Sequence, residues 1–576
     1  MPNLPEPESP PAEAPSPEGP SSGAPPAHQL TPRSFVAGFV LAVMLCGINS
    51  YLTLSFGVIE EGPTIAALFF FAIFFLSRRH IQTSEMVIVA TMGSAGGSLG
   101  FISNFFAAKA MTGPAYPLWQ MAGFAIVTSL IGMAFVIPLR DLLILREQLP
   151  WPGSKATAGV IEALVERGDP RQPWYLLAAF LVAVSYVIAN TDGGFGLVPA
   201  ESALPVWGLA AFGAAIAWSP FAIGGAYLMG FLTCVGFLVG GLALLVMAPH
   251  TPDPSAPHRY VWPGIGFLVA TGLTMMAVNW RVIVGSMRSL VALRRQTDDD
   301  DPVLSGRVFV GFSAVALVVT ALFAGLGMGL NLVLVVLLVV VGGFLQNVIA
   351  TRAAAQTAFN PARVMGVLLQ GVTALAGGAS AGTNLAGAGF VAGSGAQAGN
   401  LTGDMAYGRW FRVPSRWQFW TQLATIVPCS LVSAYVFEQI HASTPLSLEG
   451  DGLAAPVAKM WAATALIFDG SKPMPPFAME SMGLAALAGV VYVLLESSPK
   501  LARVMPSSIG IGIGLVLPVS YDLAFFLGGV ILWLGLGRWL KVRDITLTTV
   551  AVGCIVAEGI GGVVKPLLAL AHVLPR

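Results

Sequence analysis

Acidic side chains inside apolar stretches are the residues of this sequence that could do chemistry. Glu558 is the clearest case, because it lies in the run CIVAEGIGG, well inside the last apolar segment. An ionisable group there costs roughly 3 kcal/mol to insert into a membrane, so it is a functional candidate. A carboxyl group that gains and loses a proton can couple proton movement to a second event. Glu558 is therefore predicted to couple protons, and a structural pair with Lys565 is the alternative.

Asp404 is the second candidate for proton coupling. It follows a stretch of small and amide residues, 371–403, and precedes a basic loop that holds Arg409 and Arg412. A carboxylate at this place could line a gate on the cytoplasmic side. It could also cap a helix and pair with one of the two arginines, and both interpretations stay open.

Two further acidic residues are interpreted as structural. Asp522 lies between two apolar pieces and is expected to cap the helix that follows it. Glu85 comes directly after Thr83 and Ser84 and is expected at the start of a helix near the membrane interface.

Neutral polar side chains in glycine-rich segments could contact a substrate. Segment 371–403 contains many small residues and almost no bulky ones. Such a segment suits close helix packing or the wall of a water-filled cavity, where its carbonyls and amides can face a solute. The residues predicted to bind substrate are Asn49, Tyr51, Thr91, Ser94, Asn384, Gln397 and Asn400. A packing interface of the GxxxG type is the alternative.

The composition excludes most soluble classes. Hydrophobic residues make up 55% of the 576 residues, charged residues only 10%, and the mean hydropathy is +0.77. Because a soluble domain is roughly a quarter charged, a soluble enzyme and a disordered protein are excluded. The 29 basic residues balance the 29 acidic ones, which argues against a nucleic-acid partner. The lipid bilayer is the expected partner, and the abundant glycine and proline favour a transporter or channel.

Motifs for bound cofactors and for catalysis are missing from the sequence. It contains no GxxxxGK[ST] loop and no HExxH motif. The four cysteines lie in apolar stretches without CxxC spacing and are expected to be buried free thiols. No cofactor, no metal site and no enzymatic activity are therefore predicted.

The chain divides into a tail and two membrane halves. We expect a disordered Pro-rich tail at 1–32, a first transmembrane half at 33–292, a charged linker at 293–306 and a second half at 307–576. Shorter apolar pieces lie near 155–165, 206–218, 384–399, 454–467 and 507–519. The predicted fold class is an all-α polytopic membrane protein with roughly 14–16 transmembrane helices, including short or re-entrant segments.

The halves are predicted to be repeats of one another. Residues 87–91 (VIVAT) resemble residues 348–352 (VIATR), and residues 223–226 (IGGA) resemble residues 527–530 (LGGV). Chance similarity among glycine-rich helices is the alternative. Basic loops, with acidic or uncharged loops between them, predict that both termini are cytoplasmic in a multi-pass protein of the cell membrane.

The order of several motifs resembles the oligopeptide transporter family. These motifs are residues 139–164, from LRD through LPWPGSKATA to VIEAL, then 218–230, 397–408, 418–423 and 510–518. The resemblance covers the chain from about residue 35 to the end. It implies a secondary transporter of about sixteen helices, driven by protons, for small peptides or, in the Yellow-Stripe-like branch, metal complexes of amino-acid-like chelators.

Two candidate residues match motifs of that family. Asp404 matches the acidic residue of the family's DLKTG stretch, although Ala406 and Tyr407 replace Lys and Thr here. Glu558 resembles the acidic residue of a late GEG element, with Ala557 in place of the first glycine.

The predicted function is therefore proton-coupled import of oligopeptides or peptide-like solutes. A metal–chelator transporter differs from it only in cargo, and a gated channel would differ in showing no saturation. A membrane enzyme would need a clustered nucleophile, base or metal set, and the sequence offers none. The small-molecule substrate and protons are the expected partners, and a homo-oligomer is allowed for.

Overall fold

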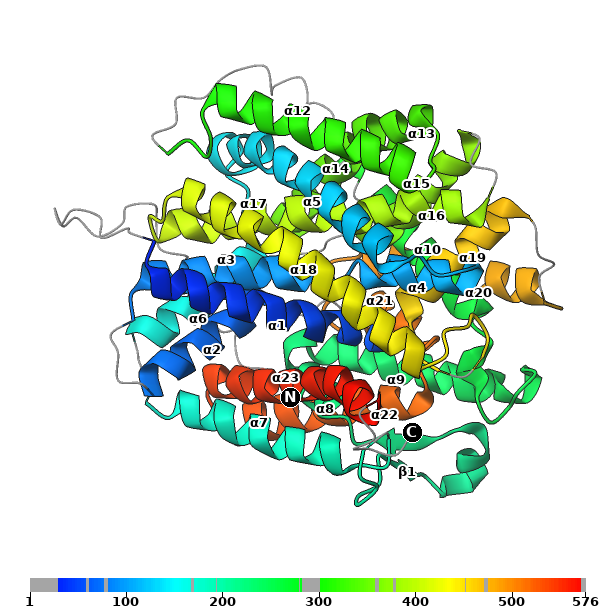
Figure 1. The fold of residues 1–576 in the computed structure, drawn as a ribbon. Coiled ribbons are helices and arrows are strands. Elements are labelled where there is room, and N and C mark those ends of the chain that lie inside the picture. Colours follow the sequence, from blue (N-terminus) through cyan, green and yellow to red (C-terminus); the bar gives the residue numbers. More distant parts are fainter. Residues whose placement is uncertain are drawn as a thin grey trace.

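The computed structural model describes residues 30–57, 62–76, 81–166, 170–192, 194–278, 280–281, 301–357, 362–376, 380–450, 452–470 and 475–570. The tail predicted to be disordered and most of the predicted linker lie outside these ranges. The described chain is almost entirely helical, with one small two-stranded sheet (Figure 1). The predicted all-α polytopic fold class is confirmed.

The helices follow one another with short connections. The first half holds α1 (Pro32–Phe56), α2 (Gly62–Leu76), α3 (Thr83–Gly100), α4 (Ser103–Thr112), α5 (Leu118–Arg140), η1 (Asp141–Arg146), α6 (Pro152–Glu166), α7 (Gln172–Ala189), β1 (Glu201–Ala203), η2 (Val206–Phe212), β2 (Ala215–Ala217), α8 (Pro220–Met229), α9 (Phe231–Met247), η3 (Ala248–His250), η4 (Pro257–Arg259) and α10 (Trp262–Val278). The second half holds α12 (Gly306–Leu322), η5 (Phe323–Gly327), α13 (Leu332–Val336), η6 (Leu337–Gly342), α14 (Gly343–Thr357), α15 (Ala362–Leu375), α16 (Ala381–Phe390), η7 (Val391–Gly395), α17 (Ala396–Trp410), α18 (Ser415–Ser443), α19 (Pro456–Asp469), α20 (Ala478–Glu496), α21 (Ser508–Gly514), α22 (Val519–Gly529), η8 (Val530–Trp539) and α23 (Asp544–Leu570).

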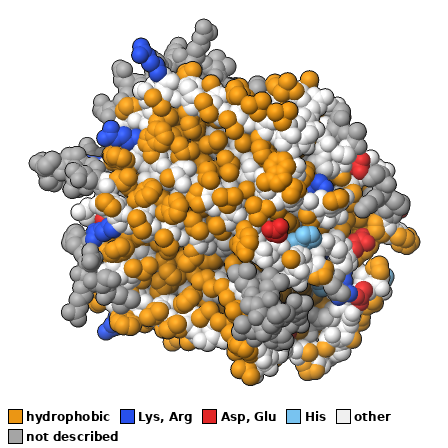
Figure 2. All heavy atoms as spheres, viewed as in Figure 1, with side chains coloured by type: hydrophobic (Ala, Val, Ile, Leu, Met, Phe, Trp, Pro, Cys, Tyr) orange, Lys and Arg blue, Asp and Glu red, His pale blue; other side chains and the backbone are white. Residues whose placement is uncertain are grey.

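The surface of the bundle matches a lipid environment. Ten helical segments of the described chain are long and apolar enough to cross a membrane, and four shorter apolar helices accompany them. Figure 2 shows hydrophobic side chains over most of the visible face. Lys and Arg side chains gather along its left edge, and most visible acidic side chains lie toward the right. The helices therefore run between a basic end and an opposite end, across the width of Figure 1.

Four long helices run in the same direction. Cys46 of α1 donates its thiol to the carbonyl of Cys429 in α18, and Ser50 donates to Ser433 with the same sequence offset. Helix α7 runs parallel to α23, because its first residue, Gln172, bonds to Thr546, and Asn190, just after its end, accepts from Lys565.

The parallel packing of α1 and α23 bears on the predicted topology. Ile48 lies opposite Gly559, and Tyr51 lies opposite Gly562, so the two helices run in register and in one direction. The start of α1 and the end of α23 are therefore at opposite ends of the bundle. This arrangement does not support the prediction that both termini are cytoplasmic. Basic loops failed to reveal it because a re-entrant segment returns to the side from which it came.

A re-entrant hairpin is formed by α21 and α22 beside α9. The backbone N–H of Ser507 donates to Leu232 near the start of α9, and Gly514 packs against Gly240. The chain then turns back, since Asp522 contacts Gly241 and Gly529 contacts Cys234. The predicted short piece at 507–519 is thus half of a hairpin, and its glycines allow the backbones of α9 and α21 to touch.

Other predicted short pieces differ in kind. Helix α8 runs along α23 from Glu558 back toward Asp544, which makes it a half-helix. The piece at 206–218 is not a helical crossing, because a 3-10 turn and the strand pair β1–β2 occupy it, with Glu201 opposite Ala217. These strands close the connection between α7 and α8.

The glycine-rich segment is a long helix enclosed by protein. It runs from Ala381 to Trp410 through α16, η7 and α17, and its residues are buried along almost all of that length. A side chain at Gly393 would collide with Thr128, and one at Gly395 would collide with Gln346. The close-packing alternative is therefore confirmed for these glycines, and the segment does not face lipid.

Some predicted structural roles can be checked directly. Glu85 is in the first turn of α3, accepts from the backbone of Gln82 and pairs with Arg33, as expected for a helix start. The four cysteines are free thiols. The glycine motifs of the two halves contact each other, because Gly528 packs on the backbone of Ile223. This contact does not test the duplication, which stays a prediction.

Candidate functional site

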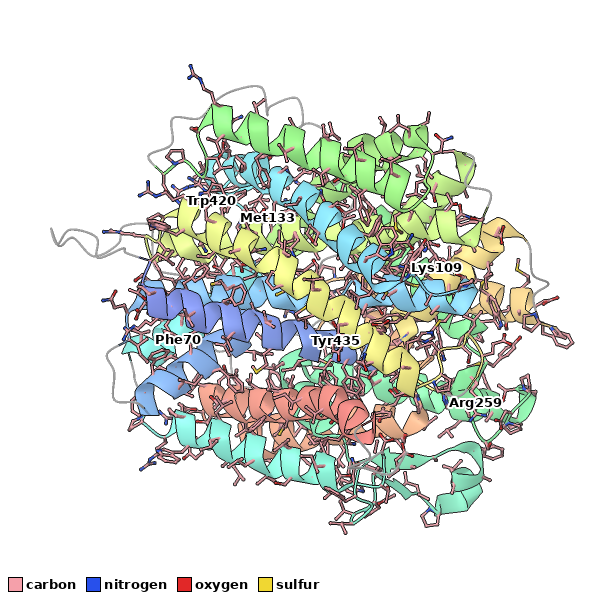
Figure 3. All side chains as sticks on the ribbon, viewed as in Figure 1. Phe70, Lys109, Met133, Arg259, Trp420 and Tyr435 are labelled. Atoms are coloured by element: carbon pink, nitrogen blue, oxygen red, sulfur yellow. The ribbon has the colours of Figure 1, made fainter. Side chains whose placement is uncertain are left out.

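A cavity of about 930 Å³ opens near the end of the bundle where the four parallel helices finish. Its wall comes from the last turns of α1, α7 and α18, the second half of α23, the starts of α8 and α22, and the β1–β2 connection. Residues that the argument uses are Tyr51, Asn190, Asp192, Glu201, Ser219, Tyr521, Glu558 and Lys565. Figure 3 shows Lys109 and Arg259 toward this same end of the molecule.

Glu558 lies in the wall of the cavity and is held by the N-terminus of α8. Its Oε2 atom accepts from the hydroxyl of Ser219 at 2.7 Å and from the backbone N–H of Phe221 at 2.8 Å. Only 8% of the residue is exposed. Ser219 also caps α8 by accepting from Ala222. The positive end of a half-helix thus stabilises the carboxylate charge, as helix N-termini do for anions.

Lys565 lies two turns beyond Glu558 and binds other groups. Its ammonium donates to Oδ1 of Asn190 at 3.0 Å and to the backbone carbonyl of Asp192 at 2.5 Å. In the part of the chain that the structure describes, no ion pair joins Glu558 to Lys565. The structural pair considered for Glu558 is therefore not formed.

The cavity presents both signs of charge to a bound solute. Glu558, Asp192 and Glu201 supply carboxylates, and Lys565 supplies an ammonium group. Asp192 and Glu201 are exposed, while Lys565 is partly buried. A zwitterion could place its ammonium near the carboxylates and its carboxylate near Lys565, because charge-assisted hydrogen bonds are the strong ones. Among the described residues, no cluster of three metal-ligating side chains is present.

Tyr51 is the one predicted substrate-binding residue that lines this cavity. Its ring fits against Gly562 of α23, where any side chain would collide with it. Glycine at 562 therefore lets α1 approach α23 while the tyrosine forms part of the cavity wall. Of the two residues predicted to couple protons, Glu558 lines the cavity and Asp404 does not.

Asp404 belongs to a second, enclosed polar region between α3, α17 and α18. Its carboxyl group interacts with Ser94 and Tyr407, and its backbone carbonyl accepts from Gln418 at 2.7 Å. The amide of Gln418 also donates to Thr91 at 3.0 Å. Asp404 is almost fully buried and forms no ion pair in the described chain, so the predicted pairing with Arg409 or Arg412 is wrong.

The same enclosed region continues along α17. Asn400 donates to the hydroxyl of Ser98, and Gln422 donates to Gln397 at 2.6 Å. These bonds connect the glycine-rich helix with α3 and α18. The predicted residues Thr91, Ser94, Gln397 and Asn400 are therefore brought together with Asp404, but not with Glu558.

Asn49 and Asn384 are buried apart from the cavity. Neither the oxygen nor the nitrogen of their amide groups has a hydrogen-bond partner among the described residues. Gln346 and Gln370 share this property. Buried amides normally find partners, so these atoms mark places where water or a solute would be accommodated.

Sequence reasoning missed several residues of the cavity. Ser219 was noticed only within the motif WSP, although a serine before a proline is the usual signal for a helix start. Asn190, Asp192 and Glu201 lie in a connection between helices, and nothing in their spacing indicates that it folds over α23. Only the hydrogen bonds of Lys565 reveal their place.

The fold and the cavity define a polytopic membrane transporter. The family model described as "OPT oligopeptide transporter protein" matches residues 29–569. The chain belongs to the oligopeptide transporter family, whose members are transporters and not enzymes.

Similar proteins come from plants and bacteria. A probable metal-nicotianamine transporter, YSL4 of Arabidopsis thaliana, is 30% identical over 164 residues, which are 23% of this chain and 24% of that protein. YSL11 of Oryza sativa subsp. japonica, also named a probable metal-nicotianamine transporter, is 28% identical over 252 residues, 37% of this chain and 35% of that protein. A Haemophilus influenzae protein with the provisional name of an oligopeptide transporter is 27% identical over 211 residues, 36% of this chain and 32% of that protein. Each alignment thus spans between a quarter and about a third of the relative's length.

Proposed function

We propose that this protein is a secondary active transporter that imports oligopeptides or peptide-like solutes together with protons across the cytoplasmic membrane. One observation carries the proposal. The cavity combines Glu558, a buried carboxylate at a helix N-terminus, with an ammonium group and two exposed carboxylates. A zwitterionic solute and a proton could therefore occupy the same cavity.

The orientation follows from the distribution of charge. Basic residues near the starts of the parallel helices α1, α18 and α23 include Arg33, Arg416 and Arg543. Since cytoplasmic loops carry an excess of Lys and Arg, we place this end in the cytoplasm. The cavity then opens to the outside, which is the state that an importer uses to take up its cargo.

Metal complexes of amino-acid-like chelators are the second candidate cargo. This alternative is favoured by the names of the plant relatives, which are given as metal-nicotianamine transporters. The chemistry of the cavity suits it as well, because such chelators present amino and carboxylate groups. The described residues offer no metal-ligating cluster, so the complex would be recognised intact.

Counterflow in proteoliposomes tests the proposal. The purified full chain is reconstituted, the vesicles are loaded with unlabelled dipeptides or tripeptides, and uptake of the labelled peptide is followed at two external pH values. We expect saturable counterflow and an accumulation that a protonophore abolishes.

Competition separates the candidate functions. Strong inhibition by an iron–nicotianamine complex, with little inhibition by peptides, would assign the chelate as cargo. Currents that do not saturate with solute concentration would indicate a gated channel and would contradict the carrier.

A further inference from the structure

The α21–α22 hairpin contains a carboxyl group that the cavity does not use. Asp522 is in the first turn of α22 and is fully buried. Both of its carboxyl oxygens lack a hydrogen-bond partner among the described residues. The sequence-based prediction that Asp522 caps this helix is therefore wrong, because a capping carboxylate would accept from the backbone at the helix start.

Two glycines form the space that the carboxyl group occupies. A Cβ atom at Gly241 of α9 would lie 2.9 Å from Oδ2 of Asp522, and one at Gly514 of α21 would lie 3.1 Å from Oδ1. Both distances are shorter than ordinary contacts, so any side chain at either position would displace the carboxyl group. The carboxyl group is thus enclosed between two helices at the turn of the re-entrant hairpin.

No basic side chain compensates a negative charge at this place. Helices α9, α8 and η8 and strand β2 pack against α22. Their titratable or charged groups are Cys234, Tyr227 and Arg538, and α22 itself adds Tyr521. Cys234 lies at Gly529, about two turns from Asp522, Tyr227 donates to Asp544, and Arg538 is near the far end of η8. An ionised carboxylate without donor or counter-charge would cost several kcal/mol, so the neutral acid fits this conformation.

The first turn of α22 connects this group with the cavity. Tyr521 lines the cavity, and Ser520 donates to the cavity residue Glu201 at 2.8 Å. Asp522 follows directly and faces α9 instead. A rotation of this one turn would therefore move cavity groups and the carboxyl group together.

We propose that Asp522 is a second proton-carrying group of the transport cycle, distinct from Glu558. The inference rests on the proposed function of proton-coupled import. Asp522 carries its proton in the conformation described here and releases it when α21 and α22 move away from α9. In that step the O–H bond of the acid breaks, its electron pair stays on the carboxylate oxygen, and the proton passes to a water molecule.

The proton stoichiometry of reconstituted full-length protein tests the inference. Labelled dialanine is the probe, and net flux is measured while pH gradient and membrane potential are set independently. We expect the Asp522→Asn variant to move one proton fewer per cycle than the wild type. At about 100 mV this lowers the accumulation ratio about 50-fold, because each charge moved contributes about 2.3 kcal/mol. Glu480→Gln, an exposed carboxyl-to-amide change on α20, serves as the matched control and keeps the wild-type stoichiometry.

A second measurement does not depend on cargo. Infrared spectra of the wild type should contain the carbonyl-stretching band of a protonated buried carboxylic acid, and Asp522→Asn or Asp522→Ser should remove it. Persistence of this band in a folded variant, or an unchanged proton stoichiometry, would overturn the inference. Replacing sodium by choline is a further check, because loss of transport would assign a sodium ion to the site instead. If wild-type uptake is not proton-coupled at all, the proposed function fails, and that result is read before any variant is compared.

Discussion

Two buried polar regions of this molecule differ in how they are enclosed. The region around Glu558 lines a cavity of about 930 Å³ and includes groups that face solvent, such as Asp192 and Glu201. The region around Asp404 is closed by α3, α17 and α18, whose polar groups bind one another. The comparison teaches that a buried carboxylate in a transmembrane segment does not by itself indicate a cavity. An alternating-access carrier would expose one such region while the other is closed.

Replacing Glu558 by glutamine should have the largest effect on transport. The amide keeps the shape of the side chain but cannot exchange a proton, so accumulation driven by a pH gradient should fall about tenfold for each pH unit of the gradient. Counterflow, which needs no net proton movement, should continue. Labelled-peptide uptake with and without a gradient measures both, and equal gradient dependence in variant and wild type would exclude Glu558 as a coupling residue.

Removing the ammonium group of Lys565 should weaken substrate binding. If it binds the peptide carboxylate, Lys565→Met should raise KM about tenfold to a hundredfold, since a hydrogen bond to a charged group contributes about 1.5–3 kcal/mol. A peptide with an amidated C-terminus is the matched control, because it lacks that carboxylate. Similar KM increases for both peptides would show that Lys565 acts on the structure of the cavity.

Changes in the enclosed region should affect rate more than binding. Asp404→Asn preserves the size of a side chain that is packed beside Ser94 and Tyr407. We expect the maximal rate to fall about fivefold, the factor that corresponds to about 1 kcal/mol, with little change in KM. Kinetics of peptide uptake separate the two constants. A KM change as large as that of Lys565→Met would instead place Asp404 in the substrate site of this conformation.

Thiol labelling compares the two regions with the smallest effect on transport. Ser443→Cys lies in the cavity wall, and Ser394→Cys lies in the enclosed helix. A membrane-impermeant maleimide should label the first quickly and the second hardly at all. The native thiols Cys46, Cys234 and Cys429 are buried and should contribute little background. Equal labelling of the two serine replacements would remove the distinction between the regions.

Much of the fold could be predicted from hydropathy. Apolar runs, short turns and the few charges led directly to an all-α polytopic protein, because the bilayer leaves few alternatives. The glycine-rich segment was placed inside the protein correctly. Its contents were not, since glycine permits both a cavity wall and close packing, and only the contacts at Gly393 and Gly395 decide between them.

The candidate site could be predicted only in part. Glu558 and Tyr51 were found because a carboxylate and a polar aromatic residue stand out in apolar runs. Asp522 was assigned to a helix cap because its sequence position fits one, while its true surroundings come from α9, far away in the sequence. Long-range pairing of this kind leaves no local pattern, and the direction of α23 was missed for the same reason.

The hydrogen bonds of Glu558 have a mechanical consequence. Both bonded donors, the hydroxyl of Ser219 and the N–H of Phe221, belong to the beginning of α8, whereas Glu558 belongs to α23. The carboxylate therefore works as a latch between two helices, and the latch is strongest while the group is charged. One proton arriving from outside would neutralise the charge and weaken the latch at once. Chemical binding of the ion and release of the helix would then be a single event.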